Sequence, residues 1–293
     1  MSAKTVLVAG ATGQQGGYVA RALLKMNHHV RALTRKPESP AAQKLRKLGA
    51  EIVIGDFDDK SSLKNAMKGA DAVFAMGTPF EAGVEAEIRQ GIALAEAAYE
   101  CAVDHLLYTS VAGADQNTCI SHFDGKFEVE EHILSYGIPY TIIAPVFFME
   151  NLRTSWWLPG LREGRFSIAL PPEKKLQMIP LENIGEFAAM AIDRPKTFLN
   201  TRIELASDEI AVGDIAGVLS DIFGCNIEFV QTPIDQVRAM DRDFALMFEW
   251  LDQNGCSVDI AGLRRDYPEV GWQTFKEWAN SCDWSMISHL IPA

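Results

Sequence analysis

Three glycines near the N-terminus have the spacing of a loop that binds phosphate groups. They are Gly10, Gly13 and Gly16, and they follow the apolar run Thr5–Gly10 directly. In such a loop the first glycine allows a tight turn, the second lets the backbone approach a pyrophosphate, and the third lets the next helix pack against the strand. The N-terminus of that helix offers free N–H groups to the phosphates. The sequence therefore predicts a dinucleotide-binding loop.

The residues after the second apolar run indicate which dinucleotide binds. An NAD site usually has an acidic residue about 20 residues beyond the glycine loop, where it binds the ribose 2′-hydroxyl. Here the run His29–Thr34 is followed by Arg35 and Lys36, with no acid before Glu38. A guanidinium and an ammonium at this position suit a 2′-phosphate. We therefore predict NADP(H) as the cofactor, in preference to NAD(H).

A further contact with the nucleotide is expected at the end of the third apolar run. This run, Glu51–Asp56, leads into Phe57. Asp56 is placed to contact the edge of the adenine, and Phe57 its face. Asp58 or Asp59 can cap the next helix at the same time.

Candidates for proton transfer follow the fifth apolar run. The GxxGxxG spacing of the loop is typical of short-chain dehydrogenases/reductases, which use a Tyr-x-x-x-Lys motif with the tyrosine as acid and base. Lys126 would be the lysine, but His122 occupies the tyrosine position. The two share one helix face, and a histidine titrates near neutrality. Two alternatives stay open: His122 transfers protons, or the site does no chemistry and Lys126 only contacts the cofactor.

A regular alternation of apolar runs and helical stretches has to position these residues. Runs without polar alternation are typical of strands that are buried on both faces. Alternating β and α segments imply an α/β fold with a doubly wound parallel sheet of the Rossmann type. The expected strands are Thr5–Gly10, His29–Thr34, Glu51–Asp56, Ala72–Gly77, His105–Ser110 and Tyr140–Pro145, and the expected helices are Gln14–Met26, Ala41–Leu48, Ser61–Met67, Glu81–Ala102 and His122–Ser135.

The regular pattern ends after Pro145. Residues 151–177 carry Trp156, Trp157 and several prolines, with no clean period. Beyond them we expect helices over Leu181–Asp193 and Val212–Phe223, short strands over Ile203–Ala206 and Ile227–Gln231, and a mainly helical remainder. We therefore predict an NAD(P)-binding domain over residues 1–150 and a smaller, mainly helical C-terminal lobe over residues 151–293, partly threaded back into the sheet.

Composition excludes several other classes of protein. The 293 residues carry a net charge of −12, which argues against bulk binding of nucleic acid. The longest apolar run, Tyr140–Met149, is too short to span a bilayer. The five cysteines are widely spaced and form no metal-ligand pattern, so we expect free thiols and no metal. We therefore expect a cytoplasmic protein that binds neither a membrane nor a metal.

Several segments resemble the NmrA-like family of atypical short-chain dehydrogenases/reductases. The similarity covers essentially the whole chain and includes the loop GATGQQGG and the segments Thr34–Pro37 and Gly55–Asp59. It is most specific in the segment HFDGK…EVEE that begins at His122. It extends to Pro145–Asn151, where the family has a P-x-x-F-E-N type turn and this chain has Met149 as an extra residue.

The resemblance implies an NADP(H)-binding protein whose usual role is redox sensing through partners. The family includes a fungal nitrogen-metabolite regulator, a mammalian NADPH-sensing protein, and relatives that reduce quinones or plant phenolics. Carried over to this sequence, the cofactor would meet Gly10, Ala11, Thr12, Gly13, Gln14 and Gln15 at the pyrophosphate, in a loop that Gly16 completes, Arg35 and Lys36 at the 2′-phosphate, and Asp56 and Phe57 at the adenine. Gly77, Thr78 and Pro79 would lie where the family's loop passes the ribose and nicotinamide, Arg89 where relatives have a basic helix residue facing the cofactor, and Lys126, Phe148, Glu150 and Asn151 around the nicotinamide end.

Two functions follow from these residues. The missing tyrosine favours an NADP(H)-binding redox sensor that regulates a protein partner. The alternative is an NADPH-dependent oxidoreductase of a quinone or similar small molecule, with Lys126 and His122 as catalytic residues. Phe147, Phe148, Trp156 and Trp157 favour that alternative if they line a pocket for a flat substrate, although interdomain packing explains them equally well. A DNA-binding repressor is disfavoured by the acidic balance.

Overall fold

The computed structural model of this protein describes residues 2–285 and residue 287. The chain forms two compact units. The first unit consists of residues 2–117, 121–145 and 181–204, and the second of residues 118–120, 146–180 and the described residues from 205 onward. The chain therefore leaves the first unit after Pro145 and returns to it between Leu181 and Glu204.

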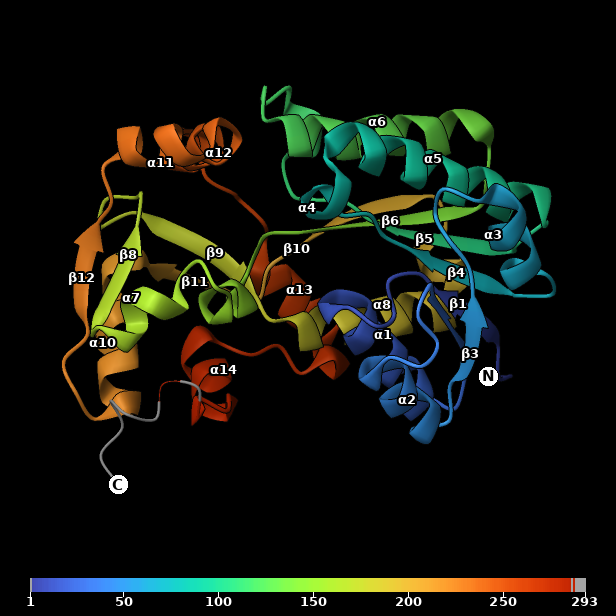
Figure 1. The fold of residues 1–293 in the computed structure, drawn as a ribbon, viewed down its shortest axis with the longest axis horizontal. Coiled ribbons are helices and arrows are strands. Elements are labelled where there is room, and N and C mark those ends of the chain that lie inside the picture. Colours follow the sequence, from blue (N-terminus) through green and yellow to red (C-terminus); the bar gives the residue numbers. More distant parts are fainter. Residues whose placement is uncertain (1, 286, 288–293) are drawn as a thin grey trace. The chain divides into compact units, whose positions relative to one another are not determined.

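A seven-stranded sheet runs through the first unit in the order β10-β6-β5-β4-β1-β2-β3 (Figure 1). Its strands are β1 (Thr5–Val8), β2 (His29–Thr34), β3 (Glu51–Ile54), β4 (Ala72–Ala75), β5 (His105–Thr109), β6 (Tyr140–Pro145) and β10 (Thr201–Leu205). The pairings among β1–β6 are parallel. The order reverses between β1 and β4, and ligands of such sheets bind beyond the carboxyl ends of the strands at this point. The predicted doubly wound parallel sheet is confirmed.

Helices cover both faces of this sheet. On one face, Leu63, Leu94 and Val129 pack into a core that also contains Leu106 and Tyr108. These helices are α3 (Lys60–Met67), α5 (Val84–Glu100) and α6 (Ser121–Tyr136), and α1 (Gln14–Lys25), α2 (Pro40–Lys47) and α8 (Leu181–Asp193) lie on the other face (Figure 1). Every residue of β4 and β5 is buried, because both faces of the middle strands are covered.

The segment after β4 differs from the predicted single helix over Glu81–Ala102. It forms a one-turn helix, α4 (Pro79–Ala82), and then α5, with Gly83 between them. Gly83 has a φ of +86°, which lies outside the helical region. The continuous helix is therefore wrong at its first turn. The remaining short helical segments of the first unit are η1 (Ala114–Gln116) and α9 (Pro195–Phe198).

The second unit contains two small sheets as well as helices. One sheet has the order β11-β9-β7 and the other pairs β12 with β8. The strands are β7 (Phe147–Phe148), β8 (Arg165–Ile168), β9 (Lys175–Ile179), β11 (Asp208–Ala211) and β12 (Glu228–Gln231), and the helices are η2 (Met149–Arg153), α7 (Leu158–Arg162), α10 (Val212–Phe223), α11 (Ile234–Met240), α12 (Arg242–Gln253), α13 (Ile260–Asp266), η3 (Pro268–Val270) and α14 (Phe275–Ser281). The sequence pattern misses β8 and β9. In the described part of the chain, no helix is long and apolar enough to cross a membrane.

Candidate functional site

The glycine loop connects β1 to α1 through a tight turn. Gly10 has a φ of +63°, and its carbonyl oxygen accepts a hydrogen bond of 2.9 Å from the Gly13 backbone N–H. Gly16 lies against this turn, because a Cβ atom on Gly16 would be 2.4 Å from the Gly10 carbonyl oxygen. A side chain at Gly16 would displace backbone, so this glycine serves the close packing of α1 against β1.

Gly13 has a different role, because the fold encloses it much less tightly than Gly16. Its φ of −89° suits any residue, and an added Cβ atom would meet only the Gly10 carbonyl oxygen, at 3.2 Å. The helix that follows has no side-chain cap and no acidic residue in its first turn. The backbone N–H groups at the start of α1 and its positive dipole end are therefore available to an anion. This arrangement fits a pyrophosphate.

The other loop residues differ in their exposure. Ala11 and Gln15 are buried, Thr12 is half-buried and Gln14 is exposed. The Gln15 side-chain amide donates a hydrogen bond of 2.8 Å to the hydroxyl of Thr109 at the end of β5. This bond ties α1 to β5. The Gln15 side chain therefore supports the loop from within the protein.

Arg35 and Lys36 follow β2 and are both exposed. The Arg35 guanidinium forms an ion pair of 2.8 Å with the Glu81 carboxylate of α4. The Lys36 backbone N–H donates a hydrogen bond of 3.0 Å to the Thr34 hydroxyl, which shapes the turn after the strand. Arg35 therefore already has a counter-charge within the protein.

The turn after β3 holds Asp56 and Phe57, which are half-buried. Phe57 packs against the core under α3 and α5, and the Asp56 carboxylate accepts a hydrogen bond of 3.1 Å from the Asp58 N–H. Arg89 of α5, a predicted cofactor contact, forms an ion pair of 3.0 Å with Asp58. Hydrogen bonds from Arg89 and Gln90 lower the pKa of Asp58. The Arg89 side chain therefore ties α5 to this turn.

The segment after β4 brings Gly77 next to a carboxylate of α5. A Cβ atom on Gly77 would be 2.8 Å from the Glu87 Cγ atom. Thr78 and Pro79 start α4, where the Thr78 hydroxyl accepts a hydrogen bond from the Phe80 N–H. Gly77 therefore lets the backbone at the end of β4 pass close to Glu87.

Lys126 meets this same carboxylate. Its Nζ atom lies 2.7 Å from Glu87 Oε1 and 3.5 Å from the Gly77 carbonyl oxygen. The Lys126 side chain is 13% exposed and the Glu87 side chain is fully buried. A buried carboxylate fixes the ammonium in one position, because an unpaired charge in this environment costs several kcal/mol.

Sequence reasoning misses Glu87. The sequence carries one signal: Glu87 lies one helical turn before the small residue Gly91. In the structure, Gly91 lies on the packed face of α5, because a Cβ atom there would be 2.8 Å from a methyl group of Val129 of α6. A carboxylate on the packed face of a helix needs a cation. Lys126 on the predicted neighbouring helix is that cation.

His122 and Lys126 lie one turn apart on α6, as expected. His122 is half-buried, and its ring makes an edge-to-face contact with Phe123 at 4.9 Å between ring centroids. Placing a histidine one turn before the lysine is therefore possible in this fold. Whether either residue acts in catalysis stays a prediction.

A second buried ion pair lies one turn further along α6. The Glu130 carboxylate accepts a hydrogen bond of 2.8 Å from Arg202 Nε of β10. Burial raises the pKa of Glu130, although Ser110 and Arg202 act against this shift. Burial also raises the pKa of Tyr108, and the carboxylates of Glu87 and Glu130 add to that shift. The Tyr108 phenol is therefore held in its neutral form between the two ion pairs.

Arg202 also holds the segment that follows Ser110. Its guanidinium donates a hydrogen bond of 3.3 Å to the Val111 carbonyl oxygen, and Glu204 accepts one of 2.9 Å from the Gly113 N–H. Arg202 and Glu204 are themselves paired at 3.1 Å. The end of β10 therefore fixes the connection between β5 and α6.

Comparison with known proteins identifies this arrangement. The sequence profile of the NmrA-like family matches residues 2–279. The chain belongs to the NmrA-like family. An NmrA-like family domain-containing protein of Dictyostelium discoideum is 28% identical to it, over 86% of this chain and 88% of that protein. The phenylcoumaran benzylic ether reductase PT1 of Pinus taeda is 25% identical, over 96% of this chain and 99% of that protein.

Solved structures of two proteins share the fold of this NmrA-like chain. The Citrobacter sp. triphenylmethane reductase complexed with NADP(H) has a TM-score of 0.79 at 19% identity, over 95% of this chain and 99% of that chain. NmrA, a negative transcriptional regulator in complex with NADP, has a TM-score of 0.79 at 20% identity, over 96% and 95% of the two chains. At this level of identity the comparison establishes the fold.

The family turn at Phe148, Glu150 and Asn151 belongs to the second unit. The Glu150 side chain is buried, and its Oε1 atom accepts a hydrogen bond of 3.1 Å from the Trp278 indole. The Asn151 carbonyl oxygen accepts hydrogen bonds from Thr154, whose hydroxyl donates one at 2.7 Å. Within its own unit, this turn is therefore held by the residues that follow it.

Three of the four rings of the predicted aromatic cluster, all but Phe148, are in contact within the second unit, together with one further ring. Phe147 and Trp157 meet edge to face at 5.7 Å, and Trp156 lies 6.2 Å from Trp157 and 5.3 Å from Phe244 of α12. Trp156 is 42% exposed. The cluster is therefore continuous and reaches the surface of its unit.

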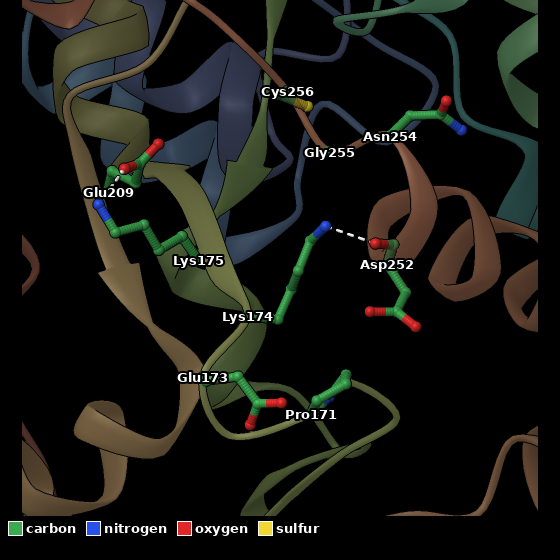
Figure 2. Close-up of a pocket in the computed structure, with 9 residues that line it drawn as sticks. All are labelled: Pro171, Glu173, Lys174, Lys175, Glu209, Asp252, Asn254, Gly255 and Cys256. Carbon is green, nitrogen blue, oxygen red and sulfur yellow. Dashed lines mark hydrogen bonds and ion pairs between the residues drawn. The ribbon is translucent and has the colours of Figure 1, made fainter.

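A polar cavity of about 410 Å³ lies elsewhere in the second unit (Figure 2). Lys174 donates a hydrogen bond to the Asp252 carbonyl oxygen, and Lys175 pairs with Glu209 at 3.0 Å. None of the predicted site residues of this family member lines it. Among residues 2–285 and 287, no group of histidine, cysteine and acidic side chains could hold a metal ion.

Proposed function

We propose that this protein binds NADP(H) at the carboxyl edge of its seven-stranded sheet and uses it to reduce a small organic molecule. The observation that carries the binding proposal is the start of α1, which has no side-chain cap and follows an exposed glycine that is much less tightly enclosed than Gly16. Anions bind at such helix starts because the N–H groups and the dipole both favour negative charge. The cofactor would supply a hydride.

The protein's own residues would position this cofactor. Gly13 and the first N–H groups of α1 would face the pyrophosphate, and Arg35 and Lys36 the 2′-phosphate. Lys126, held by Glu87 at 2.7 Å, would bind a ribose hydroxyl or orient the nicotinamide. The proton that follows the hydride would come from Lys126 or from His122, because a reduced carbonyl or quinone oxygen needs one.

Reduction is favoured over sensing by two observations. The Pinus taeda and Citrobacter proteins described above are both named as reductases. Within the second unit, the rings of Phe147, Trp156, Trp157 and Phe244 are in contact, and aromatic rings of this kind can stack on flat molecules. The second candidate is an NADP(H) sensor that regulates a protein partner, which the missing tyrosine favours and which fits the regulator NmrA.

The binding proposal is tested by Gly13→Val. We expect a folded protein that has lost NADPH binding, because the side chain would fill the space in front of α1. Gly217→Val is the matched control, since a Cβ atom on this exposed glycine meets nothing within 4 Å. Circular dichroism checks the fold and calorimetry the affinity. Wild-type affinity in the Gly13 variant, measured on folded protein, would refute the site.

The choice between reductase and sensor needs a turnover assay. The protein is incubated with NADPH and a panel of quinones and enones while NADPH absorbance is followed. If His122 transfers the proton, His122→Ala lowers turnover by about 10²- to 10⁴-fold with little change in NADPH affinity. NADPH binding without consumption across the panel would favour the sensor.

A further inference from the structure

The Glu81 carboxylate is already paired with Arg35, the cation that is proposed to bind the 2′-phosphate. Its Oε2 atom lies 2.8 Å from Arg35 Nη2, and the two side chains are 66% and 57% exposed. They lie 46 residues apart in the sequence and come from different βα connections, Arg35 from the end of β2 and Glu81 from α4. The pair therefore bridges two segments at the carboxyl edge of the sheet.

The segment that carries Glu81 is small and set apart from its neighbours. α4 has four residues, starts at the Thr78 cap, and is separated from α5 by Gly83 with its φ of +86°. Its Phe80 side chain is 74% exposed. The Arg35–Glu81 ion pair joins this small, poorly buried segment to the residues that follow β2.

We propose that Glu81 is a specificity-determining residue that competes with the cofactor's 2′-phosphate for Arg35. An exposed ion pair contributes little stability. A phosphate dianion makes stronger, charge-assisted hydrogen bonds with a guanidinium than a single carboxylate does, so it wins this competition. Phosphate and carboxylate are both negative and repel each other, so Glu81 moves away from Arg35 when the phosphate arrives.

This inference rests on the proposed NADP(H) site and has a consequence for sensing. The 2′-phosphate is present in both NADP⁺ and NADPH and absent from NAD(H). Displacement of Glu81 therefore distinguishes the phosphorylated dinucleotides from the others and does not respond to redox state. It releases α4, with its exposed Phe80, only when NADP(H) is bound.

The first test compares cofactor affinities of Glu81→Gln with those of the wild type by calorimetry. Removing the competitor should tighten NADP⁺ binding about two- to fivefold, the range of an exposed ion pair, and leave NAD⁺ binding unchanged. Glu85→Gln is the matched control: it removes the same charge from an exposed position nearby, and Glu85 forms no ion pair in the described part of the chain. It should change NADP⁺ binding by less.

Arg35→Ala separates failure of this inference from failure of the site. It should remove the preference for NADP⁺, and in its background Glu81→Gln should have no further effect. If Arg35→Ala leaves the preference intact, Arg35 does not read the phosphate, and both the assignment of Arg35 and the competition are wrong. If Arg35→Ala removes the preference but Glu81→Gln acts no more than Glu85→Gln, only the competition is wrong.

Hydrogen exchange supplies a readout that is independent of affinity. Backbone amides of residues 80–83 should exchange faster with saturating NADP⁺ than with saturating NAD⁺. In Glu81→Gln the two cofactors should give the same exchange at these amides, because the contact that the phosphate breaks is already absent. Equal exchange with both cofactors in the wild type would overturn the proposed release of α4.

Discussion

Two ion pairs at the same edge of the first unit have the same chemistry but differ in how far they are exposed to solvent. Arg35–Glu81 and Lys126–Glu87 each join a cation to a glutamate from the α4–α5 region, at 2.8 and 2.7 Å. The first pair is more than half exposed, whereas Glu87 has no exposed surface at all. Water and salt screen the first pair much more than the second. One pair can therefore exchange partners, and the other is fixed.

A second buried ion pair lies near Lys126–Glu87. Glu130 and Arg202 form another buried pair one turn along α6, and Arg202 holds the Val111 carbonyl oxygen after β5. Charges buried in this way cost free energy unless each has its partner. The part of the site that holds Lys126 is therefore built to stay in place, while the part around Arg35 is built to respond to a charged ligand.

The largest expected effect comes from breaking the fixed pair. Glu87→Gln leaves Lys126 without a counter-charge, and we expect the free energy of unfolding to fall by about 3–5 kcal/mol. Glu81→Gln is the exposed counterpart and should cost no more than about 1 kcal/mol. Urea denaturation of both variants measures the difference. Equal losses would show that burial does not distinguish the two pairs.

A double variant separates the missing charge from the missing contact. In Glu87→Gln with Lys126→Met, no charge is left unpaired, so much of the lost stability should return. The double variant should bind NADPH more weakly than the wild type, because the Lys126 ammonium is gone. Recovery of both stability and affinity would remove Lys126 from the proposed site.

The next effect concerns a buried base at the opposite end of β5. His105 Nε2 lies 2.7 Å from the Thr141 hydroxyl, which donates its only proton to the Phe198 carbonyl oxygen, so His105 donates to Thr141. Burial lowers the pKa of His105 from 6.5 to about 4. The unfolded chain binds the proton first as pH falls, so stability is full above pH 6.5 and is lost between pH 6.5 and about 4.

The lowered pKa of His105 corresponds to about 3 kcal/mol of folding stability. In His105→Gln, whose amide can still donate to Thr141, the loss of stability over this pH window should be smaller by that order. His28 also has a lowered pKa from burial, so part of the slope remains. His29→Gln, at an exposed position, is the control. An unchanged slope in the His105 variant would contradict a buried neutral imidazole.

The sequence predicts the sheet well because its strands are buried on both faces. Short apolar runs such as Ala72–Ala75 and His105–Thr109, which alternate with longer helical patterns, are typical of such strands. The break at Gly83 escapes the pattern, because Glu81, Ala82, Glu85 and Ala86 around it are good helix formers. Strands β8 and β9 escape it because they are short and lie beside Pro171 and Pro172, in a region without a period.

The parts of the site that depend on neighbouring residues can be predicted from the sequence, whereas those that depend on distant residues cannot. The loop from Gly10 to Gly16 is predictable because its spacing is local. The pairing of Lys126 with Glu87 depends on how α5 and α6 pack, and the two residues are 39 positions apart in the sequence. The partner of Arg35 is 46 positions away, so a cation that looks free in the sequence already has a counter-charge in the fold.

The smallest expected effect is that of an exposed ion pair, and its response to salt should differ from that of the buried pair. Arg89→Ala removes the exposed ion pair of 3.0 Å with Asp58, whose side chains are 65% and 50% exposed. We expect a small fall in the urea midpoint, about a fifth or less of that in Glu87→Gln. At about 1 M salt the Debye length is near 3 Å, so the loss of stability in Arg89→Ala should vanish.

The loss of stability in Glu87→Gln should persist at the same salt, because water and ions do not reach a fully buried carboxylate site. A deficit in Arg89→Ala that survives high salt would place Arg89 with the fixed part of the site, and a deficit in Glu87→Gln that disappears would place Glu87 with the exchangeable part.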